Sequence, residues 1–392
     1  MPRAAFLRRC PGLLSLDESA AGYAAVTVSY SRPKDAATDR SRVNRCGGIE
    51  VIIPNLNWRY SGGTATNQAI APRLARMMGL AWLGANRPNG VMRLTFGDLM
   101  RVYARRTPPV VWHARRNIEM AVGLLLKFLG WPLVLIFTSA GQRRKTITTR
   151  WLIDRMDAVI APSAASASFL HRPAVVVPHG VDLVRYPPAA DRAADWAASG
   201  LPGRYGIGCF GRVRPQKGTD LFVTAMCRLL PRYPDFTAVV IGETTWEQRA
   251  FAARLKAQAA AAGLSDRILF LGVLPAEEVP RWFARISIYA FTSRNEGFGL
   301  TLLEAMAAGV ALVAARAGAA EIVVVDGATG LLVPPGDVDA LASALESLMR
   351  DPATAAGMGG GARARADAEF SIDAEVARIV EVYRAVRSGG HP

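Results

Sequence analysis

Two glutamates, Glu296 and Glu304, bracket a glycine-phenylalanine-glycine turn in the stretch RNEGFGLTLLEAMAAG, residues 294–309. A lone acidic residue here would be explained by the positive end of a helix dipole. Two carboxylates beside a flexible turn and a helix start allow more. Carboxylate oxygens accept hydrogen bonds from sugar hydroxyls, while the free N–H groups of a helix start suit an anion. The stretch therefore predicts a site for an anion and a polyhydroxylated ligand together.

A second stretch, GRVRPQKGTD at residues 211–220, places Arg212 and Lys217 on a loop that follows a predicted strand. Two cations five residues apart on such a loop can converge on a pyrophosphate, Arg through paired hydrogen bonds and Lys as a point charge. Solvated loop charges are the alternative. Because this loop and the helix start near Glu296 belong to the same predicted sheet, we favour the ligand site.

A third stretch, NWRYSGGTATN at residues 57–67, follows the first predicted strand and contains Gly62 and Gly63. Two glycines before a helix let the backbone approach a phosphate or sugar closely. Any tight turn can use two glycines, so this prediction depends on the position of the turn in the sheet.

The elements that must position these loops alternate between short β-branched runs and helical patterns. The first set of predicted strands covers 49–55, 109–114, 133–139, 158–163 and 174–180, with a helix from Thr66 to Met78. The second set covers 205–211, 236–242, 267–272, 286–293, 311–316 and 330–336. Such alternation predicts an α/β fold of two doubly wound Rossmann-like domains that face a cleft, with ligands at the carboxyl ends of the strands.

The first predicted domain covers residues 48–190 and the second covers residues 191–370, and a polar linker at 187–204 joins them. A final helix at 371–392 starts from Ser371 and carries an apolar stripe that includes Tyr383, so we expect it to pack across the junction. Residues 1–47 lack a lasting period. We expect them to form a disordered extension, of the kind that a start codon assigned too far upstream produces.

Two motifs are misleading on inspection. The glycines of GIGCFG at 206–211 match a dinucleotide fingerprint, but they lie within a predicted strand and Pro215 follows, so a dehydrogenase is disfavoured. Asp337 and Asp339 resemble a metal-binding pair, yet they open a helical pattern and are better explained as a helix cap. No metal is therefore expected.

The net charge of +15 is unevenly distributed: residues 1–190 hold 26 Lys and Arg against 10 Asp and Glu, and residues 191–392 hold 21 against 22. An anionic membrane, an anionic substrate or a nucleic acid can each explain a basic half. Without an aromatic platform or a helix-turn-helix pattern, nucleic acid is the remote alternative.

The four cysteines form no Cys-x-x-Cys pair, which favours a reducing compartment. The apolar stretch at 120–140 is interrupted by Lys127 and by Gly130-Trp131-Pro132, so a helix followed by a strand is expected there rather than a membrane span.

Three motifs in order, GRVRPQKG, NEGFGLTLLEAMAAGVALVAA and DGATGLLVPPGDVDAL, resemble the retaining family-4 glycosyltransferases of GT-B architecture. The Glu-x7-Glu spacing is that family's hallmark, and the resemblance runs from Gly48 to about residue 387. VVWHARRNIEM at 110–120 and PHGVDLVRY at 178–186 look like the lipopolysaccharide core mannosyltransferases of Gram-negative bacteria. That resemblance implies transfer of mannose from GDP-mannose to a Kdo residue of the inner core, without cofactor or metal. A transferase that uses a UDP- or ADP-sugar on another envelope acceptor is the alternative.

By the same resemblance, Arg212 and Lys217 would neutralise the departing phosphates. Glu296 would bind the donor sugar and Glu304 the ribose. The backbone of Phe298, Gly299 and Leu300 would contact sugar and phosphate.

The acceptor side departs from the family pattern, because Thr138-Ser139 stands where many relatives carry a His. His113, which Arg115 and Arg116 follow, is our candidate for the acceptor side, and a structural histidine is the equal alternative. For His179 a structural role is expected. The basic residues of the first half would meet a Kdo–lipid A acceptor and the anionic inner membrane at its cytoplasmic face: Arg101, Arg105, Arg106, Arg143, Arg144, Lys145 and Arg150.

Overall fold

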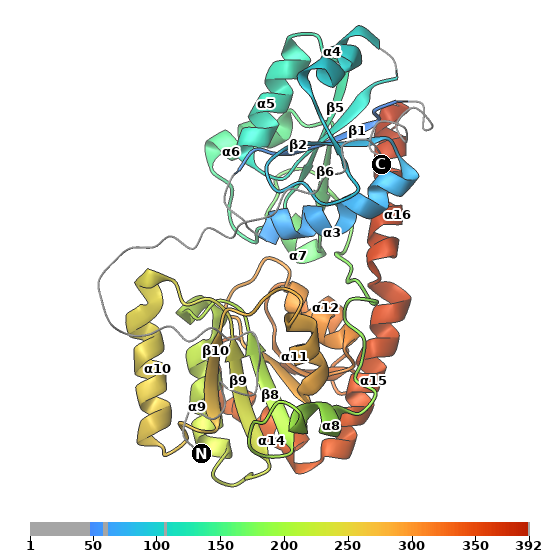
Figure 1. Ribbon diagram of the computed structural model, residues 1–392. Helices are drawn as coiled ribbons and strands as arrows, with labels where there is room; N and C mark the ends of the chain where they lie inside the picture. Colours follow the sequence, from blue (N-terminus) through green and yellow to red (C-terminus); the bar gives the residue numbers. More distant parts are fainter. Residues whose placement is uncertain (1–47, 58–61, 106–107, 391–392) are drawn as a thin grey trace, which may run out of the picture.

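The computed structural model describes residues 48–57, 62–105 and 108–390, so the prediction for residues 1–47 lies outside the described chain. Figure 1 shows two α/β units, one above the other. The first holds a seven-stranded sheet in the order β3-β2-β1-β4-β5-β6-β7. Its strands are β1 (Val51–Asn55), β2 (Leu80–Gly84), β3 (Met92–Arg93), β4 (Val110–Ala114), β5 (Leu133–Thr138), β6 (Ala158–Ala161) and β7 (Val175–Val176). Its helices are α3 (Gly62–Met77), α4 (Phe96–Arg105), α5 (Asn117–Phe128), α6 (Ile147–Asp154) and α7 (Ala164–Ala167).

The second unit holds a six-stranded sheet in the order β10-β9-β8-β11-β12-β13. Its strands are β8 (Tyr205–Phe210), β9 (Phe236–Ile241), β10 (Ile268–Gly272), β11 (Ile288–Phe291), β12 (Ala311–Ala315) and β13 (Gly330–Val333). Its helical elements are α8 (Arg192–Ala197), η1 (Pro215–Lys217), α9 (Thr219–Leu229), η2 (Trp246–Gln248), α10 (Arg249–Ala261), α11 (Val279–Arg285), α12 (Leu300–Ala307), α13 (Ala320–Val323), α14 (Val338–Arg350) and α15 (Pro352–Glu369).

All neighbouring strands in both sheets pair in parallel. The strand order shows that the direction of winding reverses between β1 and β4 in the first sheet and between β8 and β11 in the second. In open parallel sheets, ligands bind outside the carboxyl ends of the strands at such a switch point. The predicted doubly wound architecture is confirmed.

The sequence analysis did not predict two strands, β2 and β3. Both lie in a part of the chain that was interpreted as helical, but β2 pairs with β1 from Val51↔Leu80 to Asn55↔Gly84. The signal is poor because β2 begins three residues after α3 ends, with only Gly79 as a break. A Cβ at Gly79 would lie 2.0 Å from the carbonyl oxygen of Gly48, so glycine is needed where these two backbones approach.

The apolar stretch at 120–140 forms the greater part of α5 and the whole of β5, as predicted. Within the described ranges, no helix combines the length and the apolar character needed to cross a bilayer. Asp337 caps α14 by accepting hydrogen bonds from the N–H groups of Asp339 and Ala340, which confirms the capping interpretation. The glycines of GIGCFG lie in β8 up to Phe210, and the following helix α9 begins at Thr219, also as predicted.

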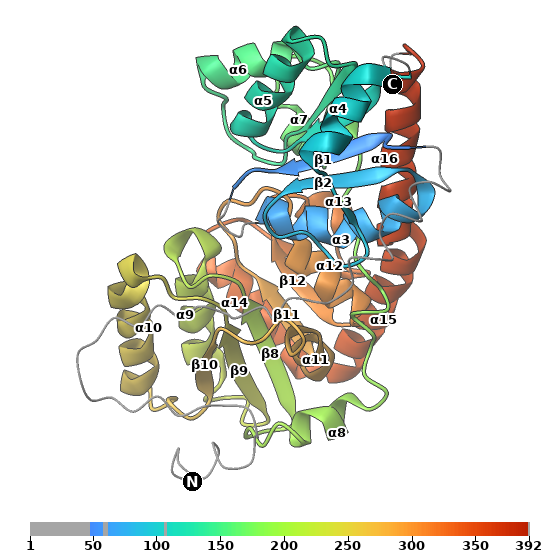
Figure 2. The ribbon, with the colours of Figure 1, turned by 45° about the horizontal axis from the view of Figure 1, so that its top comes forward.

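The final helix α16 (Ile372–Arg387) returns to the first unit, where it packs along α3 (Figures 1 and 2). Ser371 caps it by accepting from the N–H of Ala374, and Ile379, Val380 and Tyr383 are buried in the core of the first unit. Burial of this apolar stripe holds the helix across the junction, as the sequence predicted.

Glu375 of α16 fixes the connection between the two units. The Glu375 carboxylate is buried and bonds the ring Nδ1 of His179 at 2.8 Å and the backbone N–H of Gly180 at 2.8 Å. A Cβ at Gly180 would lie 2.4 Å from the carbonyl oxygen of Ser371, so the chain passes very close to the start of α16. The structural role expected for His179 matches these contacts.

Glu375→Ala is expected to destabilise the protein by about 3 kcal/mol, because it leaves the partly buried N–H of Gly180 and the buried imidazole of His179 without their acceptor. Urea unfolding of the whole chain measures the loss. Glu381→Ala, which removes an exposed glutamate of the same helix, is the matched control and should change stability by less than about 0.5 kcal/mol. Equal unfolding curves for the two variants would contradict this assignment.

Candidate active site

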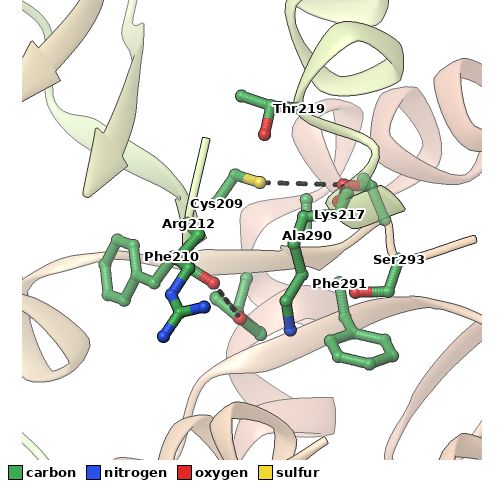
Figure 3. A pocket seen from close by; sticks show the side chains of 11 residues that line it. Cys209, Phe210, Arg212, Lys217, Thr219, Ala290, Phe291 and Ser293 are labelled. Carbon is green, nitrogen blue, oxygen red and sulfur yellow. Dashed lines mark hydrogen bonds between the residues drawn. The ribbon is translucent and has the colours of Figure 1, made fainter. Parts of the chain in front are cut away.

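Two loops meet at the switch point of the second sheet, one after β8 (residues 211–218) and one after β11 (residues 292–299). A pocket there is lined by Arg212, Lys217, Thr219 and Ser293, together with the ends of both strands. Figure 3 shows the side chains of Arg212 and Lys217 at this pocket. The structure thus brings both predicted cations to the carboxyl edge of the sheet, where the sequence placed them.

Lys217 and Glu296 form an ion pair between Nζ and Oε2 across the two loops. Their side chains are only 22% and 19% exposed, so solvent screens this pair less than a surface pair. Arg212 differs, since its side chain is half-exposed and its Nε lies 3.5 Å from Oε2 of Glu243. Such an exposed pair contributes little free energy, which leaves the Arg212 guanidinium able to turn toward a ligand.

Further contacts, which the sequence did not predict, fix the two loops against each other. Arg294 donates two hydrogen bonds to the carboxylate of Asp220, at 2.8 and 2.7 Å, and its backbone N–H bonds the carbonyl of Gln216. Gly218 adopts φ 67°, and a Cβ there would lie 2.0 Å from the carbonyl oxygen of Thr292. These contacts set the position of Lys217 relative to Glu296.

The glycine turn, residues 297–299, leads directly into α12. Gly299 has φ 100° and occupies the N-cap position, and Phe298 is buried with its ring edge against His179 at 4.9 Å between centroids. Among the described residues, the backbone N–H groups of Phe298, Gly299 and Leu300 donate no hydrogen bond. Free N–H groups at a helix start are a suitable site for phosphate.

The glycine turn also contacts the first unit. The hydroxyl of Ser166 bonds the carbonyl of Gly297 at 3.3 Å, and the side chain of Gln142 donates to the carbonyl of Gly318 at 3.0 Å. The site therefore lies where the two units meet. Neither Ser166 nor Gln142 was identified from the sequence, because nothing in their local pattern indicates which loop crosses to the other unit.

Glu304 lies in α12, about one turn beyond the glycine turn. Burial raises the pKa of its carboxyl group, while a hydrogen bond from Tyr186 and the charge of Arg185 act in the opposite direction. Tyr186 belongs to the PHGVDLVRY motif but was not predicted as a site residue. It acts on the carboxylate that the family resemblance implies for ribose binding.

We expect donor affinity to fall as the pH drops, because only the ionised Glu304 can accept hydrogen bonds from two hydroxyls. Since the pKa of Glu304 is raised, the fall should begin at a pH above the ordinary pKa of glutamate. Tyr186→Phe removes a bond that favours the ionised form, so the decline should move to higher pH. The dissociation constant of the nucleoside diphosphate, measured by calorimetry against pH, checks this.

Glu304→Gln should lose this pH dependence altogether. Tyr205→Phe, at another tyrosine of the second unit, is the control. A Tyr186→Phe profile that coincides with that of the unaltered protein would refute the role of Tyr186.

On the first unit, His113 is buried at the end of β4. Its Nδ1 shares a hydrogen bond of 2.5 Å with the hydroxyl of Tyr383, and its Nε2 shares one of 2.7 Å with the hydroxyl of Thr138. Burial, and then the charge of Arg115, hold the pKa of His113 well below its ordinary value. These contacts fit the structural alternative, because both ring nitrogens are engaged; the acceptor-side role of His113 stays a prediction.

A buried polar network lies at the carboxyl ends of β1 and β4. Arg116 donates to the side chains of Asn55 at 2.7 Å, Thr64 at 2.6 Å and Glu119 at 2.8 Å, and Glu119 is fully buried. Glu119 also accepts from the backbone N–H of Arg115 at 2.8 Å. The pattern HARRNIE gave no signal for this network, which requires side chains from three elements.

Arg115 stands apart from that network. Its side chain makes no hydrogen bond among the described residues, and its Nε is buried without a partner. Burial lowers the pKa of this guanidinium, and the negative charges of Glu375 and Glu119 oppose that effect. A guanidinium held in this way at the carboxyl end of a strand is ready to bind an anion.

Gly62 and Gly63 are the first two residues of α3, whereas the sequence placed the helix start at Thr66. Residues 58–61, which precede them, lie outside the described ranges. Their donor-binding role stays a prediction.

The described residues contain no group of three or more His, Cys, Asp or Glu side chains that could hold a metal ion. Cys209 lines the pocket, but burial raises the pKa of its thiol to about 11, and its Sγ contacts the hydroxyl of Thr292. Such a thiol stays protonated near neutral pH and does not act as a nucleophile.

Comparison with known proteins identifies the family. The "Glycosyl transferases group 1" family matches residues 195–365. A lipopolysaccharide core biosynthesis mannosyltransferase of Rhizobium leguminosarum bv. viciae is 49% identical over 343 residues, which covers 86% of this chain and 97% of that protein. The chain belongs to the group 1 glycosyltransferases.

This glycosyltransferase is similar over most of its length to a second lipopolysaccharide core biosynthesis mannosyltransferase, from Rhizobium meliloti strain 1021, at 42% identity over 86% of this chain and 98% of that protein. It is 31% identical to a GDP-mannose-dependent α-(1-6)-phosphatidylinositol monomannoside mannosyltransferase of Mycolicibacterium smegmatis, over 74% of this chain and 73% of that protein. The resemblance to the core mannosyltransferases is thereby confirmed, and the glycosyltransferase is an enzyme.

The fold of the glycosyltransferase matches that of Anabaena Alr3699/HepE in complex with UDP. The TM-score is 0.75 over 86% of this chain and 100% of that one, at 21% sequence identity. This likeness concerns the fold alone and confirms the predicted GT-B architecture.

Proposed function

We propose that this glycosyltransferase moves mannose from GDP-mannose, with retention of configuration, to a Kdo residue of the lipopolysaccharide inner core. The observation that carries the proposal is the Lys217–Glu296 pair, held beside the glycine turn at the switch point of the second sheet. The full-length similarity to two core mannosyltransferases supports the sugar and the pathway. The mycobacterial relative that is named as GDP-mannose-dependent supports the donor.

In the proposed reaction, the bond between the sugar carbon and the diphosphate oxygen breaks, and the acceptor hydroxyl oxygen forms the new bond on the same face. The acceptor proton passes to an oxygen of the departing diphosphate. Lys217 and Arg212 stabilise the charge that develops on that diphosphate, as do the free N–H groups of the glycine turn. Glu296 accepts from hydroxyls of the donor sugar, and Glu304 accepts from the ribose.

We further propose that no metal takes part, because two cations and a helix start already provide positive charge where the diphosphate leaves. A chelating agent should leave the rate unchanged. A rate that collapses on chelation and returns with a divalent cation would contradict this part of the proposal.

On the acceptor side, Arg115 supplies a guanidinium that can bind the carboxylate of an acidic sugar such as Kdo. Arg115→Met is expected to raise the KM for a Kdo-terminated acceptor by about tenfold or more, as expected for a lost charged hydrogen bond. Steady-state kinetics with a soluble acceptor measure this.

Arg93→Met, which alters an exposed arginine of β3, is the control. An acceptor whose carboxylate is reduced to an alcohol should be used equally poorly by the Arg115 variant and the unaltered enzyme. If Arg115→Met leaves the KM for the acidic acceptor unchanged, the carboxylate is bound elsewhere.

The basic first unit fits an acceptor that carries phosphates and carboxylates in a membrane. We place the enzyme at the cytoplasmic face of the inner membrane, with Kdo–lipid A as its acceptor and the anionic lipid surface as a partner. A transferase with a UDP- or ADP-sugar donor is the second candidate, because the roles proposed above concern the diphosphate, the ribose and the sugar and do not select the base.

A donor panel decides between these candidates. The purified enzyme is offered GDP-mannose, UDP-glucose and UDP-N-acetylglucosamine in turn, and hydrolysis or transfer is measured for each. We expect activity with GDP-mannose. Activity only with a UDP-sugar would reject the mannosyl transfer.

A further inference from the structure

Helix α5 turns an apolar surface toward solvent. Its sequence, NIEMAVGLLLKF, is apolar on nearly every side, a composition typical of a helix that is covered all round. Its inner side is covered: Met120 is fully buried, and a Cβ at Gly123 would collide with the ring of Trp112. Its outer side is not covered by any described residue, and the exposed fractions of Ile118, Leu125, Phe128 and the following Leu129 are 54%, 55%, 86% and 52%.

Helix α6 extends this surface. Ile147 and Trp151, one helical turn apart, are 86% and 52% exposed. The side chain of Asn117 donates to the hydroxyl of Thr149 at 2.7 Å, which joins the two helices, and both views show them side by side (Figures 1 and 2). We call the six side chains Ile118, Leu125, Phe128, Leu129, Ile147 and Trp151 the apolar face. Six large apolar side chains exposed on two neighbouring helices indicate an interaction site.

Basic side chains surround the apolar face. Arg143, Arg144, Arg150 and Arg155 are exposed in and beside α6, and the Arg155 guanidinium lies 3.7 Å from the centre of the Trp151 ring. Of the two aspartates described in this segment, Asp157 forms an ion pair with Lys127, and Asp154 shares a hydrogen bond with the ring of His171. An aromatic ring beside arginines, with little free negative charge, matches the interface of an anionic lipid bilayer.

The apolar face reaches the edge of the first unit that faces the second unit. Both α5 and α6 follow the carboxyl end of a strand, so their first residues, including Ile118 and Ile147, lie at the edge of the sheet that faces the second unit. From there the face continues to Phe128 at the far end of α5. A bilayer in contact with it would bring the headgroup of a membrane lipid to the entrance of the site.

We propose that the apolar face is the surface by which the enzyme docks on an anionic bilayer, with the apolar side chains at the acyl boundary and the arginines at the lipid phosphates. The inference deepens the proposed function, on which it rests for the identity of the lipid-linked acceptor. The occupant is lipid, because the charge around the face complements anionic headgroups.

Flotation of the full-length enzyme with vesicles tests the docking. Vesicles of phosphatidylethanolamine and phosphatidylglycerol are compared with vesicles of phosphatidylcholine alone. We expect binding to the anionic vesicles that weakens at high salt. Phe128→Ser and Trp151→Ser should each lower the affinity by roughly tenfold, since each removes an aromatic group from the interface.

Trp246→Ser removes an exposed aromatic residue from the second unit and is the matched control. Arg144→Gln combined with Arg150→Gln should weaken binding to anionic vesicles only. Unchanged thermal unfolding midpoints show that the variants fold.

Equal binding by the Phe128, Trp151 and Trp246 variants would overturn the proposal, as would equal binding of the unaltered enzyme to both kinds of vesicle. A concentration-dependent dimer that Phe128→Ser abolishes, without any vesicle binding, would show that a second copy covers the face and would also overturn it. Vesicle binding needs neither donor nor acceptor. Failure here therefore leaves the mannosyl transfer standing, and failure of the donor panel leaves the docking standing.

Discussion

Glu296→Ala is expected to lower kcat/KM by about three orders of magnitude, because it removes both the acceptor for the sugar hydroxyls and the partner of Lys217. Glu296→Gln keeps the shape and one acceptor oxygen, so it should retain part of the activity. Glu321→Ala, at an exposed glutamate of α13, is the control. Circular dichroism should show that all three proteins are folded.

Near-normal turnover by Glu296→Ala would refute the role of this carboxylate. Loss of turnover with a normal donor KM would show that the carboxylate acts mainly in the transition state, and loss with a raised KM would show that it also binds the ground state.

Lys217→Ala is expected to lower kcat by about two to three orders of magnitude, because it removes the positive charge proposed to stabilise the negative charge that develops on the leaving diphosphate. The loss should fall on kcat more than on the donor KM. Lys217→Arg keeps a positive charge and should recover part of the rate. Lys256→Ala removes an exposed lysine of α10 and serves as the control.

The two substitutions should not be additive. Lys217 and Glu296 form one ion pair, so the double variant is expected to lose less than the product of the single losses. Pre-steady-state measurement of sugar release follows the chemical step in all four proteins. Strict additivity would show that the two side chains act independently.

The strands of the second unit and its two main site loops were predictable from local patterns, whereas the Arg294–Asp220 contact and Tyr186 were not. The β8 loop and the glycine turn carry their own signals, since Arg212, Lys217 and Glu296 each stand beside a glycine or a strand end whose geometry can be read from spacing. Parallel sheets then bring successive strand ends to one edge, so the pairing of Lys217 with Glu296 follows from the order of the strands.

The first unit was less predictable, because its polar groups are arranged by tertiary contacts. Arg116 is held by Asn55, Thr64 and Glu119 from three separate elements, and no spacing in the chain indicates that. His113 illustrates the same difficulty: its partner Tyr383 lies on a helix that returns from the far end of the sequence. The apolar face could not be predicted for a related reason. The sequence of α5 is typical of a buried helix, and only the tertiary structure shows that its outer side is exposed.

The most direct test of the account is the product formed from GDP-mannose with and without Kdo–lipid A. Mass spectrometry of the lipid follows the addition of a hexose, and nuclear magnetic resonance gives its anomeric configuration. We predict one mannose added to the Kdo-bearing lipid, with the α configuration of the donor retained, and none added to lipid A that lacks Kdo. Transfer to lipid A without Kdo, inversion of configuration, or no transfer from GDP-mannose under conditions in which a UDP-sugar is used would contradict it.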